Sequence, residues 1–149
     1  MRIAIGSDHA GLELKTEILS LLKALGHEYI DYGTDTPASV DYPDYGEKVS
    51  YDVAKGKVDR GILICGTGIG MSIVANKFRG VRAALVNDLY SARCSREHND
   101  SNVLVIGGRV VGKELAKEIA RVWLNTSFAG GRHQKRLEKI EALEKETFK

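Results

Sequence analysis

A cysteine followed by a glycine-rich loop is the stretch of this sequence best suited to chemistry. Cys65 ends the short apolar run 61–64, and the loop 66–70, GTGIG, follows it. A glycine loop between a buried parallel strand and a helix exposes main-chain N–H groups at the positive end of the helix, where small anions bind. A neighbouring thiolate is stabilised by the same groups. The pattern therefore indicates an anion site with a nucleophile or base at its rim, which favours an enzyme.

The spacing of the glycines excludes two common nucleotide motifs. The loop has G-x-G-x-G rather than G-x-G-x-x-G, and no Gly-Lys-Ser/Thr follows it as in a Walker A motif. A plain tight turn after a strand is the alternative for the loop. A small buried hydrophobic residue is the alternative for Cys65, and Cys94, inside a predicted helix, is interpreted in that structural way.

Polar residues follow two other predicted strands. Asp8 and His9 come directly after the first strand, and His98 and Asn99 follow the helix after the fourth. Loops after parallel strands gather at the carboxyl edge of a sheet, where ligands bind. We therefore treat both histidines as candidates, with a solvated loop histidine as the alternative.

Three arginines could bind a phosphate. Arg132 and Arg136 are four residues apart, so one face of a helix presents both guanidinium groups, and Arg109 follows the fifth predicted strand. The competing interpretation is a solvated helix face, balanced by Glu138 and Glu141.

The rest of the chain supplies the elements that must position these residues. Alternating strands and helices with short connections predict an α/β fold, a parallel sheet with helices on both sides. The stretch 33–44 contains both prolines and is predicted to be a loop. Strands are predicted at 2–6, 28–32, 61–64, 81–86 and 103–106, and helices at 12–25, 45–55, 71–77, 88–97, 113–124 and 132–148.

Composition limits the class of protein. The 149 residues predict a single domain, 1–149, and a formal net charge of +2 gives no reason to expect nucleic acid or membrane binding. No apolar run approaches a membrane span and no leader precedes the first strand, so we expect a cytoplasmic protein. No His/Cys cluster has zinc-site spacing, and both cysteines should be free thiols. An apolar stripe in the last helix, Leu137, Ile140 and Leu143, indicates a partner subunit or packing on its own domain.

Five stretches together resemble the ribose-5-phosphate isomerase type B family, which belongs with the galactose-6-phosphate isomerase subunits. They are IAIGSDHAG, ILICGTGIGMSIVANK, VRAALVND, SREHND and NVLVIGGRVVG. The resemblance implies a cofactor-free aldose–ketose isomerase that interconverts D-ribose 5-phosphate and D-ribulose 5-phosphate in the non-oxidative pentose phosphate pathway. It also implies a three-layer α/β/α sandwich with a five-stranded parallel, Rossmann-like sheet. The expected assembly is a homodimer or a dimer of dimers, with 132–149 contributing to the site and to the dimer.

The resemblance further implies a role for each candidate residue. Cys65 moves a proton between C2 and C1, while Met71 stands where a branch of the family has a catalytic glutamate. Ring opening falls to Thr67 and His98, assisted by Asp8. The implied anion hole for the enediolate is formed by the main chain of Gly66, Thr67, Gly68, Ile69 and Gly70. The implied phosphate clamp consists of His9, Arg109, Arg132 and Arg136, and Tyr42 and Asn99 make further substrate contacts. The resemblance also implies that His98, Asn99 and Arg109 come from the neighbouring subunit.

Two rival functions stay open at this stage. A hexose-phosphate isomerase, acting on allose 6-phosphate or galactose 6-phosphate, would differ in pocket size. A non-catalytic sugar-phosphate or nucleotide-binding module could use the same glycine loop, although a thiol, an imidazole and a carboxylate at strand ends are more than a binder requires.

Overall fold

Five short segments form one parallel sheet. The computed structural model describes residues 1–148, and the strands are β1 (Arg2–Ser7), β2 (Glu28–Asp31), β3 (Arg60–Cys65), β4 (Ala83–Leu85) and β5 (Val103–Gly107). Their order in the sheet is β2-β1-β3-β5-β4, and every neighbouring pair is parallel. The predicted five-stranded parallel sheet is confirmed.

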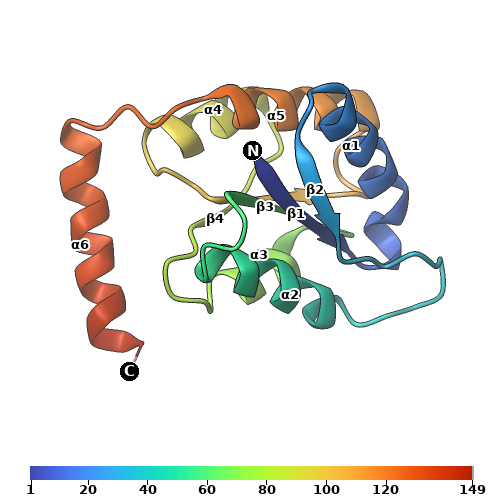
Figure 1. Ribbon diagram of the computed structural model, residues 1–149, viewed down its shortest axis with the longest axis horizontal. Helices are drawn as coiled ribbons and strands as arrows, with labels where there is room; N and C mark the ends of the chain where they lie inside the picture. The colour runs from blue at the N-terminus through green and yellow to red at the C-terminus, as the bar shows by residue number, and fades with distance from the viewer. Residues whose placement is uncertain (149) are drawn as a thin grey trace.

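Helices cover both faces of this sheet (Figure 1). The α/β/α layering that the sequence predicts is therefore confirmed. One face carries α1 (Leu12–Ala24), α4 (Leu89–Glu97) and α5 (Lys113–Asn125), and the other carries α2 (Tyr42–Ala54) and α3 (Ile69–Ala75), while a short 3-10 helix, η1 (His9–Gly11), leads into α1.

Alternation along the central strand divides the core into two halves. Ile62 and Ile64 of β3 belong to the apolar cluster under α1 and α5, whereas Leu63 and Cys65 belong to the cluster under α2 and α3. Successive side chains of a strand point to opposite faces, so both faces of β3 are buried, as its unbroken apolar run predicts. The strand also fixes the direction of the Cys65 side chain, toward α2 and α3.

Three predicted boundaries are wrong by a few residues. Helix α2 begins at Tyr42 rather than at residue 45, because Pro43 fits the first turn of a helix, where its missing N–H is not needed. Helix α3 begins at Ile69 rather than at residue 71, so the glycine loop is shorter than expected. Strand β4 covers only Ala83–Leu85, not 81–86.

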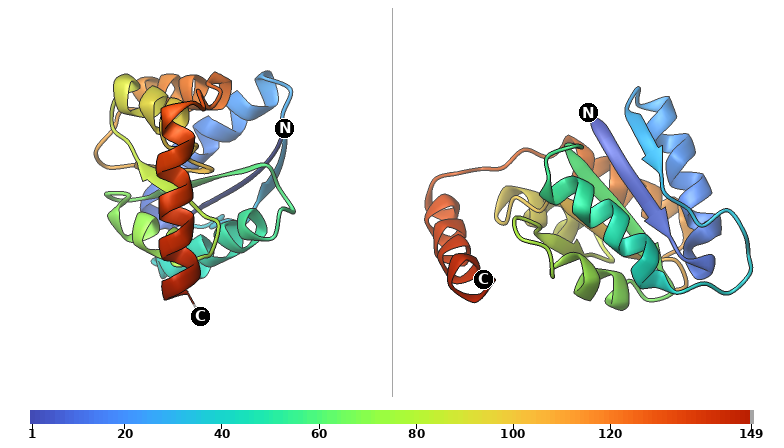
Figure 2. Two further views of the ribbon diagram at one scale, coloured as in Figure 1. Left: turned by 90° about the vertical axis from the view of Figure 1, so that its left-hand side faces the viewer. Right: turned by 60° about the horizontal axis from the view of Figure 1, so that its bottom comes forward.

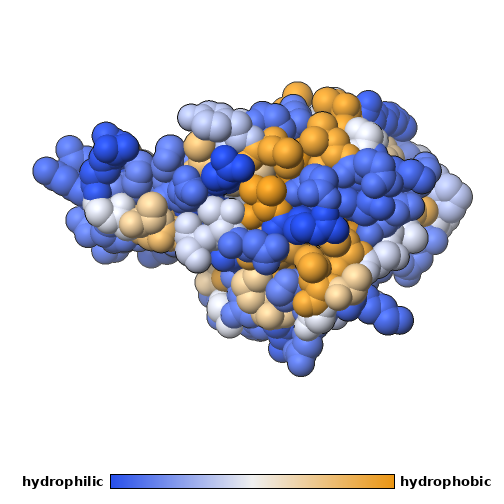
Figure 3. Space-filling view, turned by 90° about the horizontal axis from the view of Figure 1, so that it is seen from above, coloured by the Kyte–Doolittle hydropathy of each residue, from blue (hydrophilic) through white to orange (hydrophobic). Residues whose placement is uncertain are grey.

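The last helix, α6 (Arg132–Thr147), stands apart from the layers at the β4 end of the molecule (Figures 1 and 2). In the view from above it is a largely hydrophilic projection beside a body with an apolar band (Figure 3). Its C-terminal end touches the body, where the Gly80 N–H donates to Glu144 Oε1 at 2.7 Å. A groove of about 460 Å³ lies between α6 and the β4 edge, with Leu137, Ile140 and Leu143 among its lining residues. Leu137 is buried against the body of the same chain, whereas Ile140 and Leu143 are exposed in the groove.

Candidate active site

Three loops meet at the carboxyl edge of the sheet, after β1, β3 and β5. Main-chain hydrogen bonds join them: the Asp8 N–H donates to the Ile64 carbonyl at 3.3 Å, and the Gly108 N–H donates to the Cys65 carbonyl at 2.8 Å. The Arg109 N–H donates to the Gly66 carbonyl at 2.9 Å. Polar residues from distant parts of the sequence are thereby held at one edge, as expected for a parallel sheet.

The side chains of Asp8 and His9 each accept hydrogen bonds from main-chain N–H groups of their own chain. The carboxylate of Asp8 is buried and accepts hydrogen bonds from the N–H groups of Ala10 and Gly11, at 3.0 and 3.1 Å. The half-buried ring of His9 accepts a hydrogen bond at Nδ1 from the Val40 N–H, at 3.1 Å. The other ring nitrogen of His9 is the one left for a ligand.

The glycine loop presents unpaired main-chain donors. Gly68 has φ +80° and ψ −16°, a left-handed conformation that favours glycine, and its carbonyl accepts from the Ser72 N–H. Among residues 1–148, no acceptor faces the N–H groups of Gly66, Thr67 or Gly68, whereas the Ile69 N–H donates to Thr67 Oγ1 at 3.2 Å. Free N–H groups of this kind suit an anion or an oxygen on which negative charge develops.

Cys65 is more enclosed than the sequence predicts. The thiol is 4% exposed and belongs to the apolar cluster that also contains Leu63, Met71 and Val105. The prediction of a thiol at the open rim of the glycine loop is therefore wrong for the isolated chain, because the alternation of β3 turns this side chain under α2 and α3. Cys65 nevertheless directly precedes, along the chain, the three residues whose N–H groups are free.

Arg109, which the resemblance implies comes from the neighbouring subunit, lies with Tyr42 beside the glycine loop of its own chain. A methyl group placed on Gly66 would lie 3.7 Å from Arg109 Nη1, and one placed on Gly70 would meet the Tyr42 ring at 2.6 Å. Arg109 also lines, together with His9, a hollow of about 430 Å³ between the starts of α1 and α5. This group of residues, Asp8, His9, Tyr42, Cys65 to Gly70 and Arg109, is called the central group below.

The remaining predicted residues form a second group at the opposite end of the molecule, called the outer group: His98, Asn99, Arg132 and Arg136. His98 ends α4 and stacks on His133 of α6, with ring centroids 4.3 Å apart. Asn99 lines the groove under α6, and both arginines are exposed on the first two turns of that helix. A single chain therefore does not bring the outer group to the central group.

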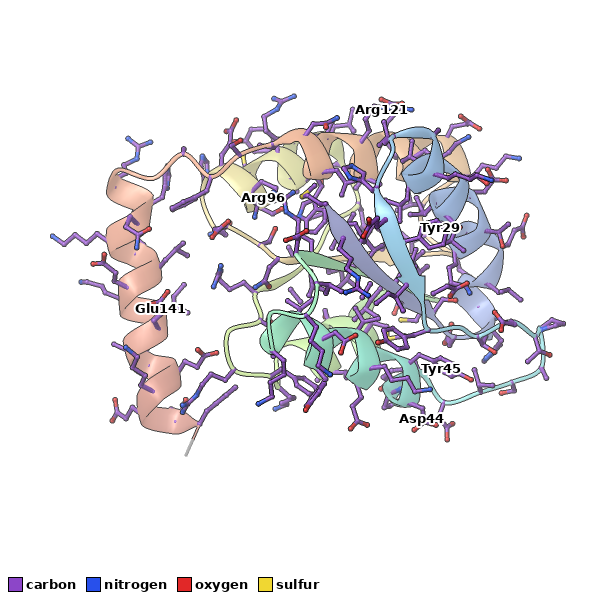
Figure 4. The ribbon with its side chains drawn as sticks, viewed as in Figure 1. Tyr29, Asp44, Tyr45, Arg96, Arg121 and Glu141 are labelled. Carbon is purple, nitrogen blue, oxygen red and sulfur yellow. The ribbon has the colours of Figure 1, made fainter. Side chains whose placement is uncertain are left out.

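A buried arginine holds the outer group in place. Arg96, which is labelled in Figure 4, is 5% exposed. It donates to Asp100 Oδ1 at 2.8 Å, to the Ser101 carbonyl at 2.6 Å and to the Thr126 carbonyl at 3.1 Å. These bonds tie the turn after α4 to the segment that leads into α6. The turn that carries His98 is thus fixed to the first residue of the connection, 126–131, that leads to α6.

Sequence reasoning missed His133. The pKa of His133 lies below its usual value, first because burial penalises the imidazolium and further because His98, Arg132 and Arg136 add positive charge. Its Nδ1 is buried without a hydrogen-bond partner among residues 1–148. The available signal was its position between two arginines chosen as candidates.

The described part of the chain holds neither a cluster of metal-binding side chains nor a helix that could span a membrane. Among residues 1–148, no three His, Cys, Asp or Glu side chains are grouped so that they could hold a metal ion. None of the helices described has the length and apolar character needed to cross a bilayer.

An α/β/α sandwich with imidazole, carboxylate, guanidinium and thiol groups around one edge of a parallel sheet is the framework of a small enzyme. Residues 3–140 match the family model described as Ribose/Galactose Isomerase, and the chain belongs to this family. The chain is accordingly a sugar isomerase of the aldose–ketose type.

Relatives cover nearly the whole chain. Ribose-5-phosphate isomerase B of Escherichia coli is 54% identical over 143 residues, 96% of each chain. The structure of Clostridium thermocellum ribose-5-phosphate isomerase B superimposes with a TM-score of 0.96 at 55% identity, covering 98% of this chain and 99% of that one. D-erythrulose-4-phosphate isomerase of Pectobacterium atrosepticum is 46% identical and covers 94% of this chain and 93% of its own length. Relatives of comparable similarity are thus named for sugar phosphates of different length.

Proposed function

We propose that this chain interconverts D-ribose 5-phosphate and D-ribulose 5-phosphate in the cytoplasm, as part of the non-oxidative pentose phosphate pathway. The observation that carries the proposal is that a strand-end thiol, Cys65, directly precedes a loop whose first three N–H groups face no acceptor among residues 1–148. Proton transfer next to a carbonyl needs a base and a set of donors aimed at the developing oxyanion. Similarity to E. coli ribose-5-phosphate isomerase B supports the five-carbon substrate.

In the proposed reaction the furanose ring opens first, with Thr67 and His98 moving the ring proton and Asp8 holding a sugar hydroxyl. The Cys65 thiolate then removes the proton from C2, and the electron pair of that C–H bond forms the C1–C2 double bond of an enediolate. The N–H groups of Gly66, Thr67 and Gly68 stabilise the negative oxygen. The thiol returns the proton to C1 and the hydroxyl proton of O2 passes to O1, so the carbonyl group moves from C1 to C2 and no oxidant or cofactor is consumed.

Phosphate binding is assigned to His9 and Arg109 of the central group together with Arg132 and Arg136. The first two line one hollow, which supports their joint action. A phosphate lies away from the reacting carbons, so its binding free energy holds the open-chain sugar in place for proton transfer.

A homodimer, alone or as a dimer of dimers, completes the proposed site. The central and outer groups lie at opposite ends of one chain, and α6 lines a groove in which Ile140 and Leu143 are exposed. Both features are what a site shared between two subunits requires, with the outer group of one chain facing the central group of the other.

The deciding experiment is an isomerase assay on metal-free protein with D-ribose 5-phosphate. Replacing Cys65 by Ala should abolish turnover while sugar-phosphate binding is retained, and Cys94→Ala is the matched control, since Cys94 is the other free thiol. An active Cys65→Ala enzyme would rule out the thiol as the base.

Substrate preference needs its own comparison, because the relatives differ in it. We expect kcat/KM to be highest for ribose 5-phosphate among ribose 5-phosphate, D-erythrulose 4-phosphate, allose 6-phosphate and galactose 6-phosphate. A higher value for the four-carbon or for a six-carbon sugar would replace the proposed substrate and leave the isomerase class intact.

A further inference from the structure

The segment between β2 and α2, residues 32–41, is anchored at its start by a buried lysine. Lys15 of α1 is 2% exposed, and its Nζ donates to both carboxylate oxygens of Asp31, at 2.7 and 2.8 Å. The exposed Asp35 lies 3.7 Å from the same ammonium group. A lysine is rarely buried unless it is paired, so these two aspartates account for its position.

The anchor continues into the end of β1. Asp31 Oδ1 also accepts from the Gly33 N–H at 2.9 Å. The Gly33 carbonyl in turn accepts from the Ser7 N–H at 2.6 Å, and the Thr34 N–H donates to the Ser7 carbonyl at 2.7 Å. Tyr45 of α2 lies against Gly33 as well, 3.1 Å from where a methyl group on Gly33 would be (Figure 4). The segment is thus fixed to the strand that leads into Asp8 and His9.

The far end of the segment touches His9 through Val40. A main-chain N–H can only donate, so the Val40 bond of 3.1 Å requires His9 Nδ1 to be a bare acceptor. In a neutral imidazole the hydrogen is then on Nε2, the nitrogen left for a ligand. Hydrogen positions on a histidine ring are usually assigned rather than observed. Here the position of the Val40 nitrogen relative to His9 Nδ1 determines the tautomer.

We propose that segment 32–41, anchored by Lys15, is a positioning element that holds His9 as a hydrogen-bond donor at Nε2, aimed at the phosphate of the substrate. Lys15 and Val40 touch no substrate in this arrangement; they act through His9. The role of His9 toward a phosphate rests on the proposed function, whereas the state of its ring does not.

The alternative is that Lys15 contributes to stability alone. A hydrophobic side chain of similar volume often replaces a buried ion pair without loss of stability. A purely structural lysine would therefore change the melting temperature but not the ring of His9. A positioning role and a purely structural role can be distinguished by the NMR spectrum of the His9 ring and by whether a substitution changes KM or kcat.

Nitrogen-15 NMR on the full-length chain tests the ring directly. We expect a scalar coupling across the hydrogen bond between the Val40 amide nitrogen and His9 Nδ1, with the hydrogen of the ring on Nε2. Lys15→Met and Val40→Pro should both remove the coupling. A hydrogen on Nδ1 in the wild-type protein, or a coupling that persists in Lys15→Met, overturns the proposal.

Kinetics test the consequence for the substrate. Val40→Pro should raise KM for ribose 5-phosphate by about tenfold, the loss expected for a hydrogen bond to a charged group, with kcat within about twofold of wild type. Ser39→Pro is the matched control, since among residues 1–148 the Ser39 N–H donates to no acceptor, and it should leave KM unchanged. An unchanged KM in Val40→Pro overturns the positioning role. Val40→Pro also keeps the test valid if Lys15→Met does not fold, because Val40 lies outside the core.

Failure of the proposed function would look different. A wild-type protein that shows the Val40–His9 coupling but does not turn over ribose 5-phosphate would disprove the reaction and leave the ring assignment intact. In that case inorganic phosphate, titrated while His9 Nε2 is observed, decides whether the nitrogen faces an anion. A shift of that resonance in wild type but not in Val40→Pro supports the positioning role, and equal shifts overturn it.

Discussion

Replacing Gly107 by alanine adds one methyl group, and this group should push the glycine loop away from the end of β5. Gly107 ends β5, pairs in register with Cys65, and lies against the main chain of Thr67. A Cβ at this position would lie 2.6 Å from the Thr67 carbonyl oxygen and 2.8 Å from its carbonyl carbon. Ordinary contacts begin at 3.4 Å, so the two chains must move apart by about 0.8 Å, the difference between 3.4 and 2.6 Å. No side-chain rotation relieves the contact, because both atoms belong to the main chain.

Gly107→Ala should therefore reduce both stability and rate. Overpacking of this kind costs about 1–3 kcal/mol, which lowers the melting temperature of a chain of this length by roughly 3–10 °C. The displaced loop carries the free N–H groups of Thr67 and Gly68, and a misplacement near 1 Å can reduce kcat by about 100-fold. Thermal unfolding followed by circular dichroism and steady-state isomerase kinetics measure the two effects.

The matched control for stability is Gly112→Ala. Gly112 has φ −65° and ψ 153°, which any residue adopts, and no heavy atom lies within 4 Å of a Cβ placed there. Alanine is a poorer first cap of α5 than glycine, so we expect a loss of at most about 1 kcal/mol. A Gly107→Ala protein with the melting temperature and kcat of wild type would refute the reasoning, because the loop would then have room that the structure denies it.

Two further predictions concern the outer group. The pKa of His133 is lower in the fold than in an unfolded chain, where histidine titrates near 6.5. Acidification below about pH 6.5 should therefore destabilise the protein, because the unfolded chain takes up the proton first. The melting temperature of His133→Asn should fall less than that of wild type between pH 7.5 and 5.5, and equal falls would contradict this. If the site is shared, Cys65→Ala subunits and Arg132→Ala/Arg136→Ala subunits should each be nearly inactive as homodimers at low substrate concentration. Unfolding and refolding them together should restore about a quarter of the wild-type rate, since half of the dimers are mixed and each mixed dimer has one intact site; no recovery would contradict sharing across a dimer.

The strands β1, β3 and β5 were predictable because they are largely buried and their apolar runs show this directly. The run 61–64 has no polar residue. In a chain of 149 residues that alternates strand and helix patterns, such a run is most simply explained as a central parallel strand, which is buried on both faces. The helix starts were less predictable, since proline and glycine were interpreted as loop residues. Pro43 lies in the first turn of α2 and Gly70 in the first turn of α3, positions that tolerate both residues.

The site was predictable as a set of residue types but not as a set of distances. That Cys65 ends a strand follows from its neighbours, whereas its 4% exposure depends on how α2 and α3 pack over it. The contact of Val40 with His9 joins residues 31 positions apart through a main-chain N–H, and a main-chain donor leaves no mark in the sequence. His133 was missed for a related reason, because stacking on His98 depends on where α6 begins in space.

The strand order explains why the predicted site divides in two. Loops after β1, β3 and β5 meet because these strands are neighbours, whereas His98 and Arg132 follow α4 and α5, which return the chain to the opposite, amino edge of the parallel sheet, near the edge strand β4. Strands lie about 4.8 Å apart, so the β4 edge is roughly 14 Å from β1 in the plane of the sheet. That distance is far beyond a hydrogen bond, and α6 leads further outward from the edge. Side-chain rotation within one chain does not bring Arg132 to His9, so the proposed phosphate clamp that contains both depends on the proposed dimer.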